Sequence, residues 1–474
     1  MNIQDRYILF TPQAETPATA PATGESRRAE RQREMLDWLG LFDASKTRFT
    51  AVSEGGAPGA PAPGEVDAPQ WVPFVEHRQG SVLGPGTVLK VDQYPGIDKD
   101  LSSGKNPQPR IPGAPNYRAL PAGRAGEDRS VHGVAQPTVE GLRGVLDQVG
   151  AGPGGSGKTA MWTNLREEPV VYINGRPLNL RLASHLNENA QNPGASGQEV
   201  EKTEEQLKQD ILREAARNGG RILLHDEGPD GRPIARWETI TPESVQTPRE
   251  VFDMLRQEGY KVDYARIPVT DEKSPELKDF DALVERLKSA DPDAPLIFNC
   301  HAGRGRTTTG TVIAGLLRRA REGVQPESSV KRSEPLREDI REQGRYRPSE
   351  YKTILSLISA FEKGPQNKAE ADEIIDRHAA LQNLREAIDA LKKKAETAAT
   401  PEEREALLQR GRDYVERYHN IVAFDAYAKD QAPEGFQQSF SGWLEEHPEV
   451  RQSRSSLELA LGLVPSGAGA TAFA

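Results

Sequence analysis

The chain has 474 residues, which is enough for two or three domains of average size. Its formal net charge of -10 argues against general nucleic-acid binding, because neutralising a phosphate backbone requires a basic surface. The sequence contains 1 cysteine, which excludes an intrachain disulfide and is typical of folding in a reducing compartment.

Residues 1–78 are predicted to be a largely disordered extension, because their Pro-, Ala- and Gly-rich tracts offer too little apolar surface to offset chain entropy. Within them, residues 27–42 have the spacing of a short amphipathic helix, which is either a structured linker or a docking or export segment. No secretory signal and no transmembrane helix are expected. The protein is therefore expected in the cytoplasm or, if the extension is an export signal, inside a host cell, where it would meet a host target.

Residues 79–346 alternate between strand-like and helical runs, which predicts an α/β domain with a central sheet flanked by helices. Residues 347–450 have helical periodicity in four segments, and we expect them to pack on the α/β domain as a helical flank. Those segments are 349–363, 368–396, 402–427 and 434–446. Residues 451–474 are predicted to be a flexible tail.

Residues 152–159, GPGGSGKT, satisfy the pattern of a nucleotide-binding loop. That loop works when a strand precedes it and a helix follows it. Here the preceding segment is helical in pattern and the following segment, 161–173, is strand-like. We therefore interpret the stretch as a Gly-rich connector.

The segment PLIFN-CHAGRGR-TTTGTVIAGLL joins an apolar strand, ending at Asn299, to a helix beginning near Arg306 or Thr307. In the loop between them, Gly303 and Gly305 allow the backbone N–H groups to turn inward, and the helix directs its positive end to the same place. A cysteine at the start and an arginine at the end of such a loop are typical of a phosphate site. The alternative is a tight turn that buries a cysteine.

In that interpretation, Cys300 is a thiolate nucleophile and the Arg306 guanidinium binds two phosphate oxygens at once. The Thr307 hydroxyl donates to the sulfur and stabilises it as a leaving group. The amides of His301, Ala302, Gly303, Arg304 and Gly305 contribute the remaining donors. We refer to residues 300–306 as the phosphate loop.

Phosphoryl transfer also needs an acid to protonate the leaving oxygen. The polar stretch after the strand-like run ARIPV contains Asp271 and Glu272 and precedes the 300–306 loop in the chain. We favour Asp271 as this acid. The alternatives are Glu272 or a solvated turn without a catalytic role. Residues 270–274 are called the acid loop below.

Several separated motifs resemble the tyrosine-phosphatase-like inositol polyphosphate phosphatases, or PTP-like phytases, and their paladin-like branch in particular. The motifs are CHAGRGRTTTG, WTNLREEPVVYINGRP (162–177), RIPVTDEKSP (266–275), GAPNYR (113–118) and YVERYHNIVAFDAYA (414–428). The resemblance covers about residues 80–450. It implies a cysteine-phosphatase fold and removal of phosphates from inositol polyphosphates without a metal or another cofactor. The branch also implies phosphoinositides as substrates, or weak catalysis, as alternatives.

The resemblance implies that Arg166 lies near the phosphate loop and either ties it down through a carboxylate or reaches the substrate. A salt bridge with Glu167 or Glu168 is its alternative. His301, Arg304 and Lys273 would bind a polyanionic substrate, whereas the alternative for His301 and Arg304 is pairing with neighbouring acids. Asn299 replaces the histidine that many cysteine phosphatases have before the nucleophile. The expected partner is a phosphorylated small molecule, and the scattered histidines predict no metal site.

Overall fold

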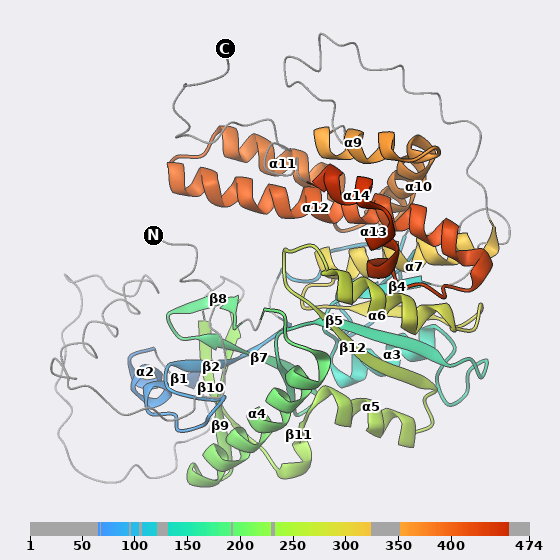
Figure 1. The fold of residues 1–474 in the computed structure, drawn as a ribbon. Coiled ribbons are helices and arrows are strands. Elements are labelled where there is room, and N and C mark those ends of the chain that lie inside the picture. Colours follow the sequence, from blue (N-terminus) through green and yellow to red (C-terminus); the bar gives the residue numbers. More distant parts are fainter. Residues whose placement is uncertain are drawn as a thin grey trace.

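The structure is a computed structural model that describes residues 65–66, 68–93, 96–103, 107–120, 131–190, 193–228, 233–323 and 351–454. Two sheets form its centre, and a layer of helices covers one side (Figure 1). The predicted α/β class is confirmed, but the alternating pattern did not predict the second sheet. The proposed helix at residues 27–42 lies outside the described residues.

The first sheet has the strand order β12-β5-β13-β4-β3, and all of it is parallel except the edge strand β3. Its three central strands, β5, β13 and β4, are buried except at Met161, as expected for a parallel sheet covered on both faces. The strands are β3 (Arg118–Ala119), β4 (Val131–Val134), β5 (Ala160–Arg166), β12 (Val262–Val269) and β13 (Leu296–Asn299).

Helices cover both faces of this sheet, because successive side chains of a strand point to opposite sides. Along β13, Leu296 and Phe298 pack with α6 (Leu277–Lys288) and α7 (Gly305–Glu322), whereas Ile297 packs with α3 (Val139–Gln148) and α5 (Pro248–Gln257). The Gly-rich stretch 152–159 joins α3 to β5, so a helix precedes it and a strand follows it, as predicted.

The second sheet is mostly antiparallel, with the order β1-β10-β9-β2-β7-β6-β11 and with β8 paired to β7. The helix α4 (Gly197–Arg217) covers one face, and α2 (Ala68–Glu76) packs on the other through Trp71. The strands are β1 (Glu65–Val66), β2 (Thr87–Val91), β6 (Val170–Ile173), β7 (Arg176–Leu182), β8 (His185–Asn189), β9 (Arg221–Glu227), β10 (Pro233–Thr239) and β11 (Val245–Gln246).

The segment 161–173, predicted as one strand, forms two strands in different sheets. β5 ends at Arg166, residues 167–169 turn, and β6 begins at Val170. Pro169 cannot donate a hydrogen bond to a sheet neighbour, which is consistent with the break. The turn therefore lies between the two sheets.

After residue 350 the described chain forms six α-helices, of which α10 and α12 pack against α7 and α13 packs against α6 (Figure 1). The segment 368–396, predicted as one helix, is divided by a turn at 378–383 into α10 and α11. The helices are α9 (Lys352–Ala360), α10 (Gly364–Arg377), α11 (Leu384–Glu396), α12 (Pro401–Gln431), α13 (Phe440–Glu446) and α14 (Pro448–Arg454).

Two boundaries differ from those expected. The described body begins before residue 79, because β1 and α2 join the second sheet. It also continues past residue 450 into α14, where Val450 is buried. Among the described residues, no helix combines the length and the hydrophobicity that crossing a bilayer would require.

Candidate active site at the carboxyl ends of the parallel strands

The candidate site lies where the parallel strands end. Asn299, the last residue of β13, is in register with Val134 on β4 and with Asn164 on β5, and Val269 on β12 is in register with Arg166. The segments that follow these strands therefore meet at one edge of the sheet, which is where open α/β sheets bind ligands. The structure thus brings together the phosphate loop, the turn at residues 167–169 and the acid loop.

The phosphate loop joins β13 to α7, and the helix begins at Gly305, one residue before the predicted start. Gly303 has a φ of 68°, and a Cβ there would lie 2.6 Å from the amide nitrogen of Ala135. Glycine is therefore required for both the turn and the close approach to the end of β4.

Two carbonyl groups of the phosphate loop accept hydrogen bonds from residues outside the loop. The amide of Gln136 donates to the His301 carbonyl at 2.9 Å, and the Asn116 side chain donates to the Ala302 carbonyl at 2.8 Å. Within the described residues, the N–H groups of Ala302, Gly303 and Arg304 donate to no acceptor. Unpaired consecutive amides before a helix N-terminus favour binding of an anion.

Cys300 starts the loop, and its side chain is adjacent to α7. The Thr307 hydroxyl donates to the Cys300 sulfur at 3.1 Å, a bond that favours a negatively charged sulfur. Cys300 is 3% exposed and Thr307 is fully buried. This contact is the one that the sequence motif predicted.

Arg306 is held from behind by Glu168. Its Nη1 and Nη2 donate to the two carboxylate oxygens at 2.8 Å and 3.0 Å, and Nη1 also reaches the Val269 carbonyl at 3.2 Å. The remaining nitrogen, Nε, is buried, makes no hydrogen bond and lies 3.2 Å from Oδ1 of Asp271. The edge of the guanidinium that includes Nε therefore faces the acid loop.

The charges of Arg306 and Glu168 stabilise each other. Burial opposes the charge of Arg306, but the carboxylates of Asp271 and Glu168 raise its pKa above the ordinary value. Burial likewise opposes ionisation of Glu168, but the guanidinium groups of Arg306 and Arg166 hold its pKa below the usual range. The pair is therefore ionised at neutral pH.

Arg166 forms a second layer behind the loop. It is fully buried, and its Nη1 and Nη2 donate to the carboxylate of Asp92 at 2.5 Å and 3.2 Å, while its Nε lies 3.5 Å from Glu168. Asp92 in turn lies 3.3 Å from Nε2 of His301. Arg166 thus ties the phosphate loop down through carboxylates instead of presenting its charge to solvent.

The two other expected loop cations differ from each other. Burial, together with the nearby guanidinium groups of Arg166 and Arg181, lowers the pKa of His301 well below its ordinary value, so its imidazole is neutral. Arg304 is partly exposed, and its side chain has no hydrogen bond or ion pair within the described residues. Only Arg304 of the two therefore fits the expectation of an added positive charge at the loop.

Asn299 supports the loop through intermediates. It accepts a hydrogen bond from the Trp162 indole at 2.8 Å and donates to the Gln136 side chain at 3.2 Å. The backbone of Gln136 binds the loop, so the link from Asn299 to the loop is indirect.

The acid loop places its two carboxylates on different sides. Asp271 faces Arg306, and its side chain is 38% exposed. Glu272 has a φ of 61°, donates its amide to Oδ1 of Asp271 at 3.1 Å, and turns its own carboxylate toward Arg410 of α12. This geometry favours Asp271 over Glu272 as the acid. Lys273 is paired with Asp413 at 2.6 Å.

The sequence interpretation did not name Asp92, and it named Glu167 and Glu168 only as possible partners of Arg166. Glu168 binds Arg306, Asp92 binds Arg166, and Glu167 accepts from the Thr270 hydroxyl at 2.9 Å and from the Gly194 amide at 2.7 Å. Burial raises the pKa of Glu167 to about 7, and the bonds from Thr270 and Gly194 oppose that rise. Two consecutive acids at the end of an apolar strand were the available signal.

Comparisons with known proteins agree with the resemblance stated above. Residues 163–318 match the model of the PTP-like phytase family, which is described by the words "inositol hexakisphosphate". Paladin from Gallus gallus is 27% identical over 339 residues, which are 70% of this chain and 36% of paladin. Paladin from Homo sapiens is 26% identical over the same length, 70% of this chain and 35% of paladin. The chain therefore spans about a third of these relatives.

Solved structures give a weaker likeness. The PTP-like myo-inositol phosphatase from Mitsuokella multacida, in complex with myo-inositol-(1,3,4,5)-tetrakisphosphate, is 19% identical with a TM-score of 0.48, covering 77% of this chain and 48% of that one. A PTP-like phytase from Bdellovibrio bacteriovorus is 19% identical with a TM-score of 0.40, and the match covers 66% of this chain and 85% of the phytase. Residues 163–318 of this chain are therefore similar to the PTP-like phytase family, and 70% of the chain is similar to paladins.

Proposed function

We propose that the protein is a cysteine-dependent phosphatase that hydrolyses phosphomonoesters of inositol polyphosphates. The observation that carries the proposal is the set of donors on one loop that make no hydrogen bond within the described residues. The amides of residues 302–304 have no acceptor within the described residues, and the Nε of Arg306 is buried without a hydrogen bond. A phosphate bound by these donors would lie next to the Cys300 sulfur.

In the first step the Cys300 thiolate attacks phosphorus, and the bond from phosphorus to the ester oxygen breaks. Asp271, protonated at the start, gives its proton to the leaving alkoxide. Arg306 and the loop amides stabilise the charge on the equatorial oxygens. The products of this step are the free alcohol and a phosphocysteine.

In the second step water attacks the phosphocysteine. Asp271, now a carboxylate, takes a proton from that water, and the bond from sulfur to phosphorus breaks. The Thr307 hydroxyl stabilises the departing thiolate through the bond seen at 3.1 Å. Every group in both steps is an amide or side chain of this chain, so we expect phosphate release to persist in EDTA.

The family match and the charge of Arg304 support an inositol polyphosphate as the substrate class. A phosphoinositide or a phosphotyrosine peptide would use the same chemistry. A catalytically weak protein that only binds phosphorylated ligands is the other alternative, and retention of Cys300, Arg306 and Asp271 argues against it.

The deciding experiment measures phosphate release from inositol hexakisphosphate, phosphoinositide vesicles and a phosphotyrosine peptide. We expect the highest kcat/KM with inositol hexakisphosphate, and a loss of more than about 10³-fold in Cys300→Ser, with inositol hexakisphosphate binding retained. Tight binding without turnover by the unmodified protein would establish the binding-only alternative. Full activity of Cys300→Ser would exclude the phosphocysteine mechanism.

A further inference from the structure

The acid loop is held by a helix that lies outside the α/β part of the molecule. α12 crosses above α7 in Figure 1, and four of its side chains contact residues 272–274. Their spacing of three, four and three residues places them on one face of the helix. The four residues are Arg410, Asp413, Arg417 and Asn420.

Three of these contacts hold side chains of the loop. Arg410 pairs with the carboxylate of Glu272. Asp413 binds the ammonium group of Lys273, and Asn420 donates to the Ser274 hydroxyl at 3.0 Å. The first two pairs are partly exposed, so each contributes little by itself.

The fourth contact holds the loop's backbone. Arg417 is 2% exposed, and its Nε donates to the Lys273 carbonyl at 3.1 Å, with its Nη2 on the same oxygen. Its guanidinium lies over the ring of Tyr414, 4.7 Å from the centroid, which fixes its plane. A buried, bidentate bond to a main-chain carbonyl restrains the path of the loop two residues after Asp271.

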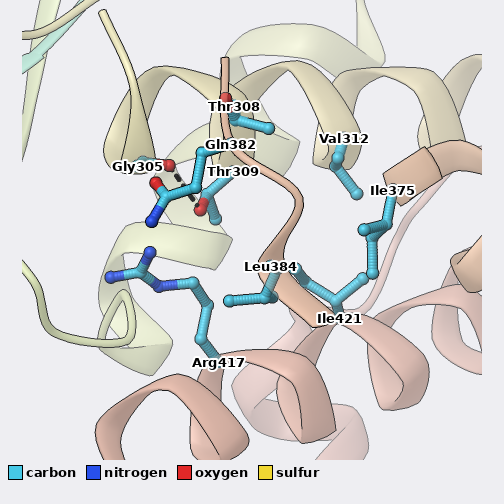
Figure 2. Close-up of a pocket in the computed structure, with 9 residues that line it drawn as sticks. All are labelled: Gly305, Thr308, Thr309, Val312, Ile375, Gln382, Leu384, Arg417 and Ile421. Carbon is cyan, nitrogen blue, oxygen red and sulfur yellow. Dashed lines mark hydrogen bonds between the residues drawn. The ribbon is translucent and has the colours of Figure 1, made fainter. Parts of the chain in front are cut away.

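Arg417 also borders the phosphate loop. A Cβ on Gly305 would lie 3.4 Å from Nη1 of Arg417 and 3.1 Å from Oε1 of Gln382. Figure 2 shows Arg417 and Gln382 at the polar end of a small pocket, with Leu384, Ile421 and Ile375 along its apolar part. The guanidinium therefore spans from the acid loop toward the first turn of α7.

The loop needs such a restraint because its backbone is strained. Glu272 occupies the left-handed region at a φ of 61°, which is unfavourable for a residue with a side chain. That conformation directs the Glu272 amide at Oδ1 of Asp271, the oxygen that faces Arg306. If the neighbouring Lys273 carbonyl were released, the amide would no longer hold the carboxyl group.

We propose that Arg417 is a positioning residue, which holds the acid loop against the phosphate loop so that the helical flank completes the catalytic centre. This inference rests on the proposed role of Asp271 as the general acid. It predicts that Arg417 affects proton transfer to the leaving group more than formation of the bond between sulfur and phosphorus.

The test compares two esters. Inositol hexakisphosphate has alkoxide leaving groups that need a proton, whereas p-nitrophenyl phosphate releases a stable phenolate. For Arg417→Met we expect the rate of phosphocysteine formation, measured in a single turnover, to fall about thirtyfold with inositol hexakisphosphate and less than about threefold with p-nitrophenyl phosphate. Arg417→Lys should recover part of the loss, because its ammonium group can donate to the same carbonyl.

Arg412→Met is the matched control. Arg412 lies on the same helix, but its side chain bonds only Glu405 and Gln409 within that helix. We expect less than about a twofold change with either ester, since the side chain contacts neither loop. If Arg417→Met folds poorly, Arg410→Gln provides a second variant at a partly exposed position. It should show the same preference for inositol hexakisphosphate, with a smaller loss.

Hydrogen exchange provides a readout that does not depend on activity. Arg417→Met should speed exchange of a peptide covering residues 270–276 about tenfold while leaving a peptide of α3 unchanged. Equal losses with both esters, or unchanged exchange of residues 270–276, would overturn the positioning role. If the unmodified protein hydrolyses neither ester, the proposed function fails, and the exchange result alone decides whether Arg417 holds the loop.

Discussion

The two loops of the candidate site are held in different ways. The phosphate loop is buried between β13 and α7 and is restrained by its own glycine, its own helix and the ends of adjacent strands. The acid loop has an Asp271 that is 38% exposed and is held by α12, whose Asp413 lies 140 residues after Lys273. The phosphate loop is thus held by contacts within the α/β part of the molecule, whereas the acid loop is held by a helix of the C-terminal part.

This difference gives a test by substrate. Changes in the phosphate loop should reduce hydrolysis of alkyl and aryl esters alike, because every ester passes through the same charged phosphoryl group. In the first step, changes at the acid loop should affect mainly the esters whose leaving group needs a proton.

The largest effect is expected for Arg306→Lys. An ammonium group cannot donate to both oxygens of Glu168 and to a phosphate as a planar fork does, and we expect a loss of about 10³-fold in kcat/KM. Steady-state kinetics with inositol hexakisphosphate and with p-nitrophenyl phosphate measure it. A loss restricted to one ester would contradict the division between the loops.

Asp271→Asn should have the next largest effect. Asparagine keeps the shape of the side chain but has no carboxyl proton to donate, so hydrolysis of inositol hexakisphosphate should fall about a hundredfold. With p-nitrophenyl phosphate the formation of phosphocysteine should change little, as measured by the burst of p-nitrophenolate in rapid-mixing experiments. If Glu272→Gln produced this pattern and Asp271→Asn did not, the acid would have been assigned to the wrong residue.

Thr307→Val should reduce turnover about tenfold, since a hydrogen bond to a charged group contributes about 1.5–3 kcal/mol. The loss concerns the thiolate as a leaving group, so phosphocysteine should accumulate. Trapping of labelled phosphate on Cys300 by acid quench detects it. An unchanged level of trapped phosphate would show that the bond at 3.1 Å plays no part in the second step.

The smallest effect is expected for a change at Glu167, next to the acid loop, and it concerns stability instead of activity. Its pKa in the folded protein, about 7, lies above its ordinary value of 4.5, so the folded state binds more protons than the unfolded state between these values. Stability should therefore fall as pH rises from 4.5 to 7. Glu167→Gln stays neutral and should gain about 1 kcal/mol over the unmodified protein at pH 8, but less at pH 5. Urea unfolding at both pH values measures this, and equal differences at the two values would refute it.

The sequence predicted the parts of the site that are close in the chain. The apolar run before Cys300, the glycine at 303 and the helical pattern after Arg306 indicated a strand, a turn and a helix, and the structure has them within one residue. The bond from Thr307 to the sulfur follows from the same local geometry. Sequence reasoning also placed Asp271 on a loop after a strand, because the alternation of strands and helices is a local pattern.

Tertiary structure decided which side chains meet. Whether Arg166 faces the substrate or a carboxylate depends on Asp92, which follows β2 of the other sheet and is 74 residues away. Glu168 binds Arg306 because β5 and β13 are neighbours in register, which no spacing in the chain reveals. A sequence determines by itself the elements stabilised by hydrogen bonds between near neighbours. Pairings across sheets, and the contact of α12 with the acid loop, arise only when the apolar faces pack and bring distant charges together.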